Sequence, residues 1–344
     1  AANNTAVGYN SLTANTTGDS STAVGKDSMK TNTTGRFNSA LGYESLALNT
    51  TGANNVALGK AALYANTTAS NNTAVGKAAL YANTTGASNV ALGYSALTSN
   101  TTAANNVAIG MEAAVSNTTG TSNVAVGFEA FKANTTGTQN VAIGSQASLA
   151  NTTGQDNISI GLLAGRGNTT ANYSVAIGTL ALGSTSNNGG SNVGIGYYAL
   201  SVNTGANNVA VGRQALTANT TGDTNTAVGK DSMKATTTGT NNSAFGARSL
   251  DANTTGTNNV AVGDMALGAN TTADNNTAVG TSALISNTTG HSHIAVGVSA
   301  GLAMTTGTHN VFLGLEAGYG GTTATRLATG GSNTLVGAVC HATA

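Results

Sequence analysis

The sequence contains no proline and no tryptophan, has a single cysteine, and carries little charge: only 7% of its 344 residues are charged. Ordinary domains carry about 25% charged residues, so this is not an ordinary globular composition. One cysteine excludes a disulfide framework. Twelve basic and twelve acidic residues give zero net charge, which removes the electrostatic basis for binding nucleic acid or an anionic membrane. No apolar run approaches the roughly 20 residues of a membrane span, so we expect no membrane insertion by this segment.

What the sequence does contain is a repeat of 17 residues, marked by a glycine that follows a bulky aliphatic residue. There are 20 copies, and the spacing departs from 17 at only three steps, of 18, 16 and 23 residues. Because the longer step of 18 is followed at once by the shorter one, the repeat indicates stacked coils that must return to register. We call these residues the turn glycines. The first eleven are Gly8, Gly25, Gly42, Gly59, Gly76, Gly93, Gly110, Gly127, Gly144, Gly161 and Gly178.

Each repeat is predicted to form two short strands and two turns. Residues 89–105, NVALGYSALTSNTTAAN, contain two runs in which large and small side chains alternate, a pattern typical of strands. Glycine or Asn-Thr-Thr-Gly interrupts each run before it reaches the length of a helix. The sequence therefore predicts an all-β fold, a parallel β-solenoid of about 20 coils. We expect one continuous repeat domain over residues 1–344, with insertions near 183–192 and 318–332.

The side-chain columns of the repeat suggest which residues are buried. The residue before each turn glycine is always large and apolar, and the residue before that is nearly always alanine. We expect the aliphatic columns to lie either inside the coil or at an interface between subunits, which the sequence alone does not distinguish. The second residue after the glycine is often polar, as at Asp27, Glu44, Glu129 and Gln146, and is expected to face water. One coil buries too few apolar side chains to fold alone, so the coils must stack.

The repeat also resembles known fibre proteins. The strings NNVALG (54–59), NNVAIG (105–110) and SNVAVG (122–127) resemble the head repeat of trimeric autotransporter adhesins, and the NTAVGxxAL…NTTG arrays resemble repeat shafts of phage tail-fibre proteins. The resemblance covers essentially the whole chain and implies a left-handed parallel β-roll with three chains side by side. The adhesin coil is usually shorter than 17 residues, and the extra residues here fall in the Asn-Thr-Thr-Gly turn.

The resemblance further implies a non-enzymatic structural or adhesive fibre segment, located outside the cell, at a cell surface or on a virion. The expected partners are further copies of the chain, as a homotrimer or fibre, and a cell-surface glycan or receptor. The alternative from the same repeat is a monomeric solenoid that binds a ligand, a glycan or ice. Tyrosine and lysine recur directly after the turn glycine, as at Tyr9, Lys26 and Tyr43, where they form either a binding surface or a solvated edge.

Asn-Thr-Thr occurs in most repeats and is formally an N-glycosylation sequon. The competing interpretation is that the asparagine begins a turn and the threonine bonds the backbone. Coils stacked about 4.8 Å apart bring neighbouring sites too close for every one to carry a glycan, which favours the turn. Adjacent threonines in a turn should also diverge, which disfavours a flat ice-binding row. The sequon asparagines are Asn15, Asn32, Asn49, Asn66, Asn83, Asn100, Asn117, Asn134, Asn151, Asn168, Asn219, Asn253, Asn270 and Asn287.

No catalytic, cofactor-binding or metal site stands out, so we expect neither an enzyme nor a cofactor. His291, His293 and His309 occupy neighbouring positions and could approach a metal, but no carboxylate or cysteine joins them, so we expect solvent-exposed corner residues. Cys340 falls in a column of alanine and serine and is expected to be a small buried residue. An enzyme normally interrupts a repeat to build its site, whereas this repeat is interrupted only twice.

Overall fold

The computed structural model describes residues 2–183, 189–319 and 328–340. It divides into two compact units, Ala1–Tyr173 (unit 1) and Ser174–Ala344 (unit 2), and each is described by itself. The continuous domain expected over 1–344 stays a prediction. Residues 184–188 and 320–327, within the two predicted insertions, lie outside the described residues.

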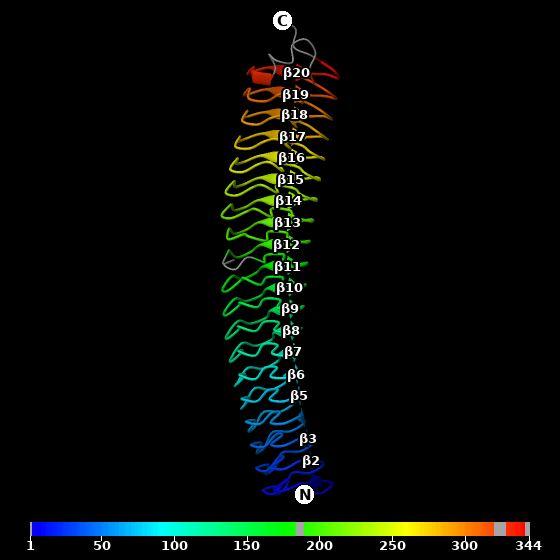
Figure 1. The fold of residues 1–344 in the computed structure, drawn as a ribbon, viewed down its shortest axis with the longest axis vertical. Helices are drawn as coiled ribbons and strands as arrows, with labels where there is room; N and C mark the ends of the chain where they lie inside the picture. Colours follow the sequence, from blue (N-terminus) through cyan, green and yellow to red (C-terminus); the bar gives the residue numbers. More distant parts are fainter. Residues whose placement is uncertain (1, 184–188, 320–327, 341–344) are drawn as a thin grey trace. The chain divides into compact units, whose positions relative to one another are not determined.

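Unit 1 is a stack of coils in which each coil contributes one three-residue strand (Figure 1). Every strand pairs in parallel with the strand of the next coil, and equivalent residues of successive repeats lie opposite each other, as Val90 lies opposite Val107. The strands are β1 (Thr5–Val7), β2 (Thr22–Val24), β3 (Ser39–Leu41), β4 (Val56–Leu58), β5 (Thr73–Val75), β6 (Val90–Leu92), β7 (Val107–Ile109), β8 (Val124–Val126), β9 (Val141–Ile143) and β10 (Ile158–Ile160).

Unit 2 repeats this architecture, and β11 to β20 pair in the same parallel, in-register way. Among its described residues, Ala328 and Thr329 alone have helical backbone. The strands are β11 (Val175–Ile177), β12 (Val193–Ile195), β13 (Val209–Val211), β14 (Thr226–Val228), β15 (Ser243–Phe245), β16 (Val260–Val262), β17 (Thr277–Val279), β18 (Ile294–Val296), β19 (Val311–Leu313) and β20 (Thr334–Val336). The predicted all-β parallel β-solenoid with a 17-residue repeat is therefore confirmed.

The second strand predicted for each coil is wrong. After Gly93 the residues Ser95 and Leu97 adopt left-handed backbone, with φ of 56° and 51°, so the chain turns where a strand was expected. The alternation of small and large side chains had the period of a strand, but alternate left-handed residues produce the same inward and outward sequence. These turns are still stacked, because the Leu97 N–H donates to the Ala113 carbonyl of the next coil at 3.0 Å.

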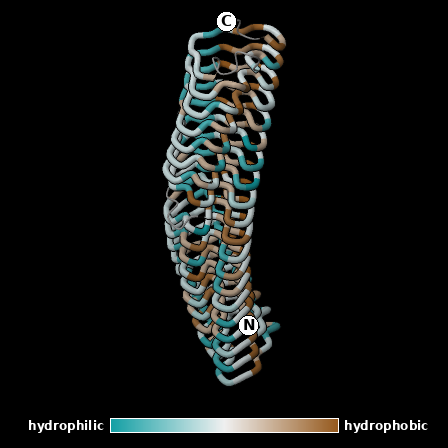
Figure 2. The backbone as a smooth tube through the Cα atoms, turned by 45° about the horizontal axis from the view of Figure 1, so that its top comes forward, coloured by the Kyte–Doolittle hydropathy of each residue, from teal (hydrophilic) through white to brown (hydrophobic). Residues whose placement is uncertain are grey.

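The interior of each coil is narrow. In the coil of Gly93 the middle strand residue Ala91, together with Ala96 and Leu97, is completely buried. The same columns of alanine and leucine form one hydrophobic cluster along unit 1. Figure 2 shows hydrophobic segments recurring at the same place in successive coils. A coil this narrow has room for one large side chain per layer, which is why the other columns alternate alanine and serine.

Candidate functional site

The first candidate surface is the outer side of the strands. The first and third residue of each strand point away from the interior, and we call these two columns the sheet face of each unit. Leu92 is 43% exposed and Ile109 is 36% exposed, whereas the alanine at the centre of each of their strands is completely buried. Of the two placements that the sequence allowed, the structure therefore excludes the interior of the coil for the residue before the turn glycine.

The sheet face is uncharged along both units, since every strand residue is Val, Ile, Leu, Phe, Ala, Gly, Ser or Thr. It is hollowed in unit 1 where the small side chains Thr22 and Ser39 begin β2 and β3. The hollow is lined by Thr22, Ser39, Ala40, Leu41, Val56, Ala57 and Leu58. This face combines apolar side chains with a receptive shape and has no partner within the chain.

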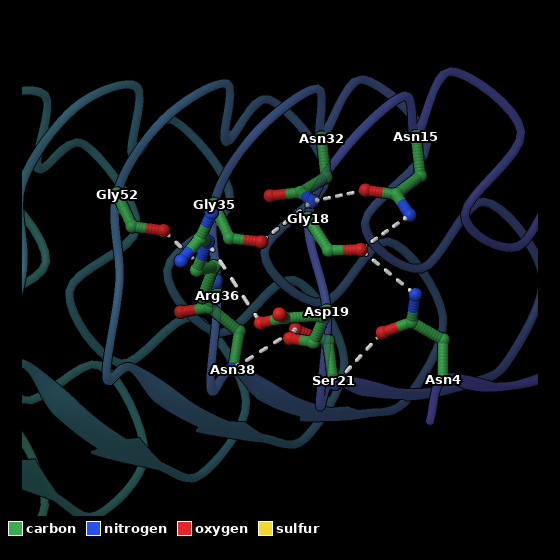
Figure 3. A network of polar contacts seen from close by, with 10 residues as sticks. All are labelled: Asn4, Asn15, Gly18, Asp19, Ser21, Asn32, Gly35, Arg36, Asn38 and Gly52. Atoms are coloured by element: carbon green, nitrogen blue, oxygen red, sulfur yellow. Dashed lines mark hydrogen bonds and ion pairs between the residues drawn. The ribbon is translucent and has the colours of Figure 1, made fainter. Parts of the chain in front are cut away.

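Two asparagine ladders hold the opposite side of the coil, and Figure 3 shows their first members pointing toward each other. The sequon asparagine Asn15 and the strand asparagine Asn4, which immediately precedes β1, both donate through Nδ2 to the Gly18 carbonyl at 2.9 Å. The sequon ladder then continues from coil to coil, because Asn32 Nδ2 donates to Asn15 Oδ1 at 3.0 Å. Each loop is thereby closed on the inside by two buried amides.

The strand asparagine has a further role that the sequence analysis missed. Its Oδ1 accepts the backbone N–H of the next strand asparagine, as Asn89 Oδ1 accepts from Asn106 at 2.9 Å. Where asparagine is absent, another acceptor replaces it: Ser21 Oγ accepts from the Asn38 N–H at 3.2 Å, and His293 Nδ1 accepts from the Asn310 N–H at 3.2 Å. The column therefore selects for a hydrogen-bond acceptor, and the substitutions themselves were the available signal.

The sequon asparagines lie inside the coils. Asn83 is completely buried, and its Nδ2 donates to Asn66 Oδ1 at 3.0 Å and to the Gly86 carbonyl at 2.9 Å. The following Thr84 donates its hydroxyl to the Thr101 carbonyl at 3.0 Å. This geometry supports the turn role that we expect for Asn-Thr-Thr. Thr84 is half-buried and only Thr85 is exposed, so the two threonines do not share one open face.

We expect the intact mass of the chain, produced in a host that glycosylates Asn-X-Thr, to equal the mass of the bare polypeptide. The Nδ2 atom that would carry a glycan is buried and donates two hydrogen bonds in a typical coil. Mass spectrometry before and after endoglycosidase treatment provides the check. A mass increment that the enzyme removes would contradict the expectation.

A second exposed surface follows the turn glycine. Residues one, two and five positions after this glycine contact each other, and we call these three columns the outer face. In unit 2, Asp231 lies 3.3 Å from Arg213 Nη2 and 3.7 Å from Lys234 Nζ. In unit 1, Lys132 Nζ lies 2.8 Å from Glu112 and 2.6 Å from Glu129, and the hydrogen bond from Lys132 lowers the pKa of the Glu129 carboxyl. Most charges on this face are thus neutralised locally.

Tyrosine and lysine side chains of the outer face alternate along the first coils of unit 1. Lys26 Nζ lies 5.9 Å from the centre of the Tyr9 ring and 5.8 Å from that of Tyr43. Ammonium groups over tyrosine faces are favourable cation–π arrangements. The predicted solvated edge is therefore a ladder in which each cation is held by rings of neighbouring coils.

The three histidines are not equivalent. His291 and His309 are exposed, as expected, and their rings meet edge to face at 5.3 Å. The expectation of a solvent-exposed corner is wrong for His293, which is completely buried because it occupies the strand-asparagine column. Among the described residues no group of three or more His, Cys, Asp or Glu is placed to hold a metal. Cys340 is half-buried, not buried as predicted, and its thiol donates to the Gly337 carbonyl at 3.2 Å.

Acid should destabilise unit 2 through His293. Burial above all lowers the pKa of His293 to about 4, whereas its ordinary value is 6.5. The unfolded chain therefore takes up a proton near pH 6.5 and the folded chain only near pH 4, so the free energy of unfolding falls as the pH decreases between these values, by roughly 3 kcal/mol in all. Urea unfolding from pH 7.5 to 4 measures this loss.

The matched variant is His293→Asn, which restores the asparagine of the ladder and cannot titrate. It is expected to remove this part of the pH dependence while leaving the stability at pH 7.5 similar or higher. Parallel pH profiles for the two proteins would show that His293 is not the responsible group.

Within the residues that the structure describes, no helix is long and apolar enough to cross a membrane. Comparison of the sequence with protein-family models and with curated proteins finds no match to either.

Proposed function

We propose that the chain is a non-enzymatic structural or adhesive fibre segment, such as the head or shaft of a surface adhesin, of an extracellular filament or of a phage tail fibre. Three copies associate through their sheet faces. The observation that carries the proposal is the uncharged aliphatic sheet face, which repeats in every coil of each unit and has no partner within the chain.

The energetic argument is that this face is too apolar to remain in water. Monomeric soluble proteins rarely expose contiguous apolar patches larger than a few hundred Å². Here residues such as Leu41, Leu58, Leu92 and Ile109 are each more than a third exposed in nearby coils, at one equivalent position of the repeat. Each aliphatic side chain that becomes fully buried contributes roughly 1.5–3 kcal/mol, so a stack of ten strands provides ample driving force for association.

A further copy of the same chain fits this face best. Its strands present aliphatic residues with the same spacing along the stack, so side chains of one copy match the gaps of another in every coil. The hollow beside Thr22 and Ser39 would accept a larger side chain from the neighbouring copy. The number three and the left-handed sense of the coil come from the resemblance to trimeric adhesin head repeats. The extracellular or virion location follows from the same resemblance.

In such a trimer the outer faces of three chains would be presented repeatedly to a cell-surface glycan or receptor. Many weak, identical contacts then combine into strong attachment without any single deep pocket. The segment would act as a spacer and as a multivalent contact surface.

Light scattering tests the assembly directly. The wild-type protein is expected to have three times the chain mass of 33.4 kDa. The combined variant Leu92→Asp, Ile109→Asp and Val126→Asp places three carboxylates on the sheet face and should raise the protein concentration at which the assembly dissociates by at least 100-fold. The matched control substitutes the exposed threonines Thr85, Thr102 and Thr119 by aspartate and should leave the mass unchanged.

Circular dichroism of both variants establishes that the coils remain folded. A wild-type mass of one chain at micromolar concentration would rule out the trimer and favour the monomeric binding solenoid instead.

A further inference from the structure

The outer face of unit 1 contains two lysines that no carboxylate neutralises. Lys60 and Lys77 directly follow the turn glycines of neighbouring coils. The ion pairs found among the described residues all involve other cations. Between Glu44 and Glu112 the sequence contains no aspartate or glutamate, so this stretch carries two positive charges in a chain whose net charge is zero.

The cause lies in one column of the repeat. The carboxylates that pair with Lys132 and with Arg213 come from Glu112, Glu129 and Asp231, which are second residues after a turn glycine. In the coils of Lys60 and Lys77 this position holds Ala61 and Ala78. The two ammonium groups therefore remain uncompensated on an exposed surface.

Tyrosines frame the two lysines. Lys60 Nζ lies 5.6 Å from the ring centre of Tyr43, in the preceding coil, and Lys77 Nζ lies 5.4 Å from that of Tyr94, in the following coil. The two ammonium groups thus lean in opposite directions along the stack, and an anion between them would relieve their repulsion. Five residues after the turn glycines of the same two coils, Tyr64 and Tyr81 stack with ring centres 5.0 Å apart.

We propose that Lys60, Lys77 and the surrounding tyrosines bind an anionic polysaccharide, with one of its carboxylate or sulfate groups between the two ammonium groups. Charge-assisted hydrogen bonds from the lysines hold the anion, and tyrosine hydroxyl groups are available to bond the sugar hydroxyls. Coils repeat about every 4.8 Å, which is comparable with the length of one sugar residue, so an extended sugar chain along the stack meets Tyr43, the lysines and Tyr94 in turn.

A single-stranded nucleic acid suits the same surface less well. Its bases bind by stacking on open aromatic faces. Here the rings of Tyr64 and Tyr81 face each other, and an ammonium group lies against the rings of Tyr43 and Tyr94. The site lies on other columns of the coil than the sheet face, so this inference goes beyond the proposed assembly and does not require it.

Isothermal titration calorimetry with three polysaccharides tests the site on the full chain. Heparin carries sulfate and carboxylate groups, polygalacturonate carries carboxylates alone, and dextran is neutral. We expect at least one of the two anionic polymers to bind at low salt and to bind much more weakly in 0.5 M NaCl, whereas dextran should not bind. The double variant Lys60→Ala, Lys77→Ala should weaken binding at least tenfold.

A second variant keeps both lysines. Ala61→Glu with Ala78→Glu adds carboxylates at positions where Glu44 and Glu112 already occur with the same left-handed backbone, so the fold is expected to tolerate it. It should cause a similar loss of binding. The control Lys132→Ala removes a lysine that two glutamates already neutralise and should leave the affinity unchanged.

Three results would overturn the proposal: no binding of either anionic polymer at low salt, unchanged binding by the Ala61→Glu, Ala78→Glu variant, or tighter binding of oligothymidylate than of both polysaccharides. Light scattering on the same samples separates these outcomes from a failure of trimer formation.

Discussion

Replacing Gly127 by alanine is expected to destabilise its coil by about 3 kcal/mol. Gly127 has a φ of 136°, a conformation that is essentially restricted to glycine. An added Cβ would lie 2.5 Å from the carbonyl oxygen of Gly144 in the next coil, so the two backbones would have to separate. Amide hydrogen exchange in the neighbouring coils should accelerate about 100-fold, measured by mass spectrometry of peptides from residues 107–144.

Gly120→Ala is the matched control, because it makes the same change seven residues earlier. Gly120 has no left-handed backbone, and the equivalent position of other coils holds alanine, as at Ala69 and Ala103. We expect a loss below about 1 kcal/mol, typical of a substitution that the native backbone already accommodates. Equal exchange in the two variants would show that the turn glycine is not conformationally required.

Replacing Asn89 by leucine should cost roughly 2–3 kcal/mol, although the side chains are similar in size. Asn89 Oδ1 is the acceptor for the buried Asn106 N–H at 2.9 Å, and leucine leaves this donor without a partner. An unsatisfied buried group costs about 1–3 kcal/mol. The lost Nδ2 bond to the Ala103 carbonyl adds less, because Asn100 continues to donate to the same oxygen.

Asn89→Ser separates the missing acceptor from the changed shape. Serine is smaller but supplies an oxygen, and Ser21 already performs this role for Asn38. The serine variant should therefore retain more stability than the leucine variant in chemical denaturation. If leucine proved as stable as serine, packing and not the acceptor would govern this column.

The sequence predicts the solenoid well because its strongest signal is the periodicity itself. A turn glycine at a constant spacing fixes the coil length, and in-register pairing such as Val90 opposite Val107 follows from identical coils. The error in the second strand has a local cause. Leucine rarely adopts a positive φ, so nothing in the pattern around Leu97 indicated the left-handed backbone that stacking with the next coil stabilises.

The candidate surfaces could be predicted only in part. Alternation shows that neighbouring strand residues point to opposite sides, but not which side is the interior, so the outward direction of Leu92 and Ile109 required the structure. His293 was assigned to the surface by its chemistry, because the acceptor role of its column is visible only in three dimensions. The missing carboxylates beside Lys60 and Lys77 can be read from the sequence once the outer-face columns are known.

The constant spacing of contacts has a consequence for how such a chain changes over generations. Within each unit, most partners in the ladders are one repeat apart, so removing or duplicating one whole repeat brings equivalent residues together again. A gain or loss of any other length places leucine opposite alanine and leaves asparagines without acceptors. Recombination between repeats therefore changes the number of coils by whole units and leaves the interior contacts of the remaining coils unaltered.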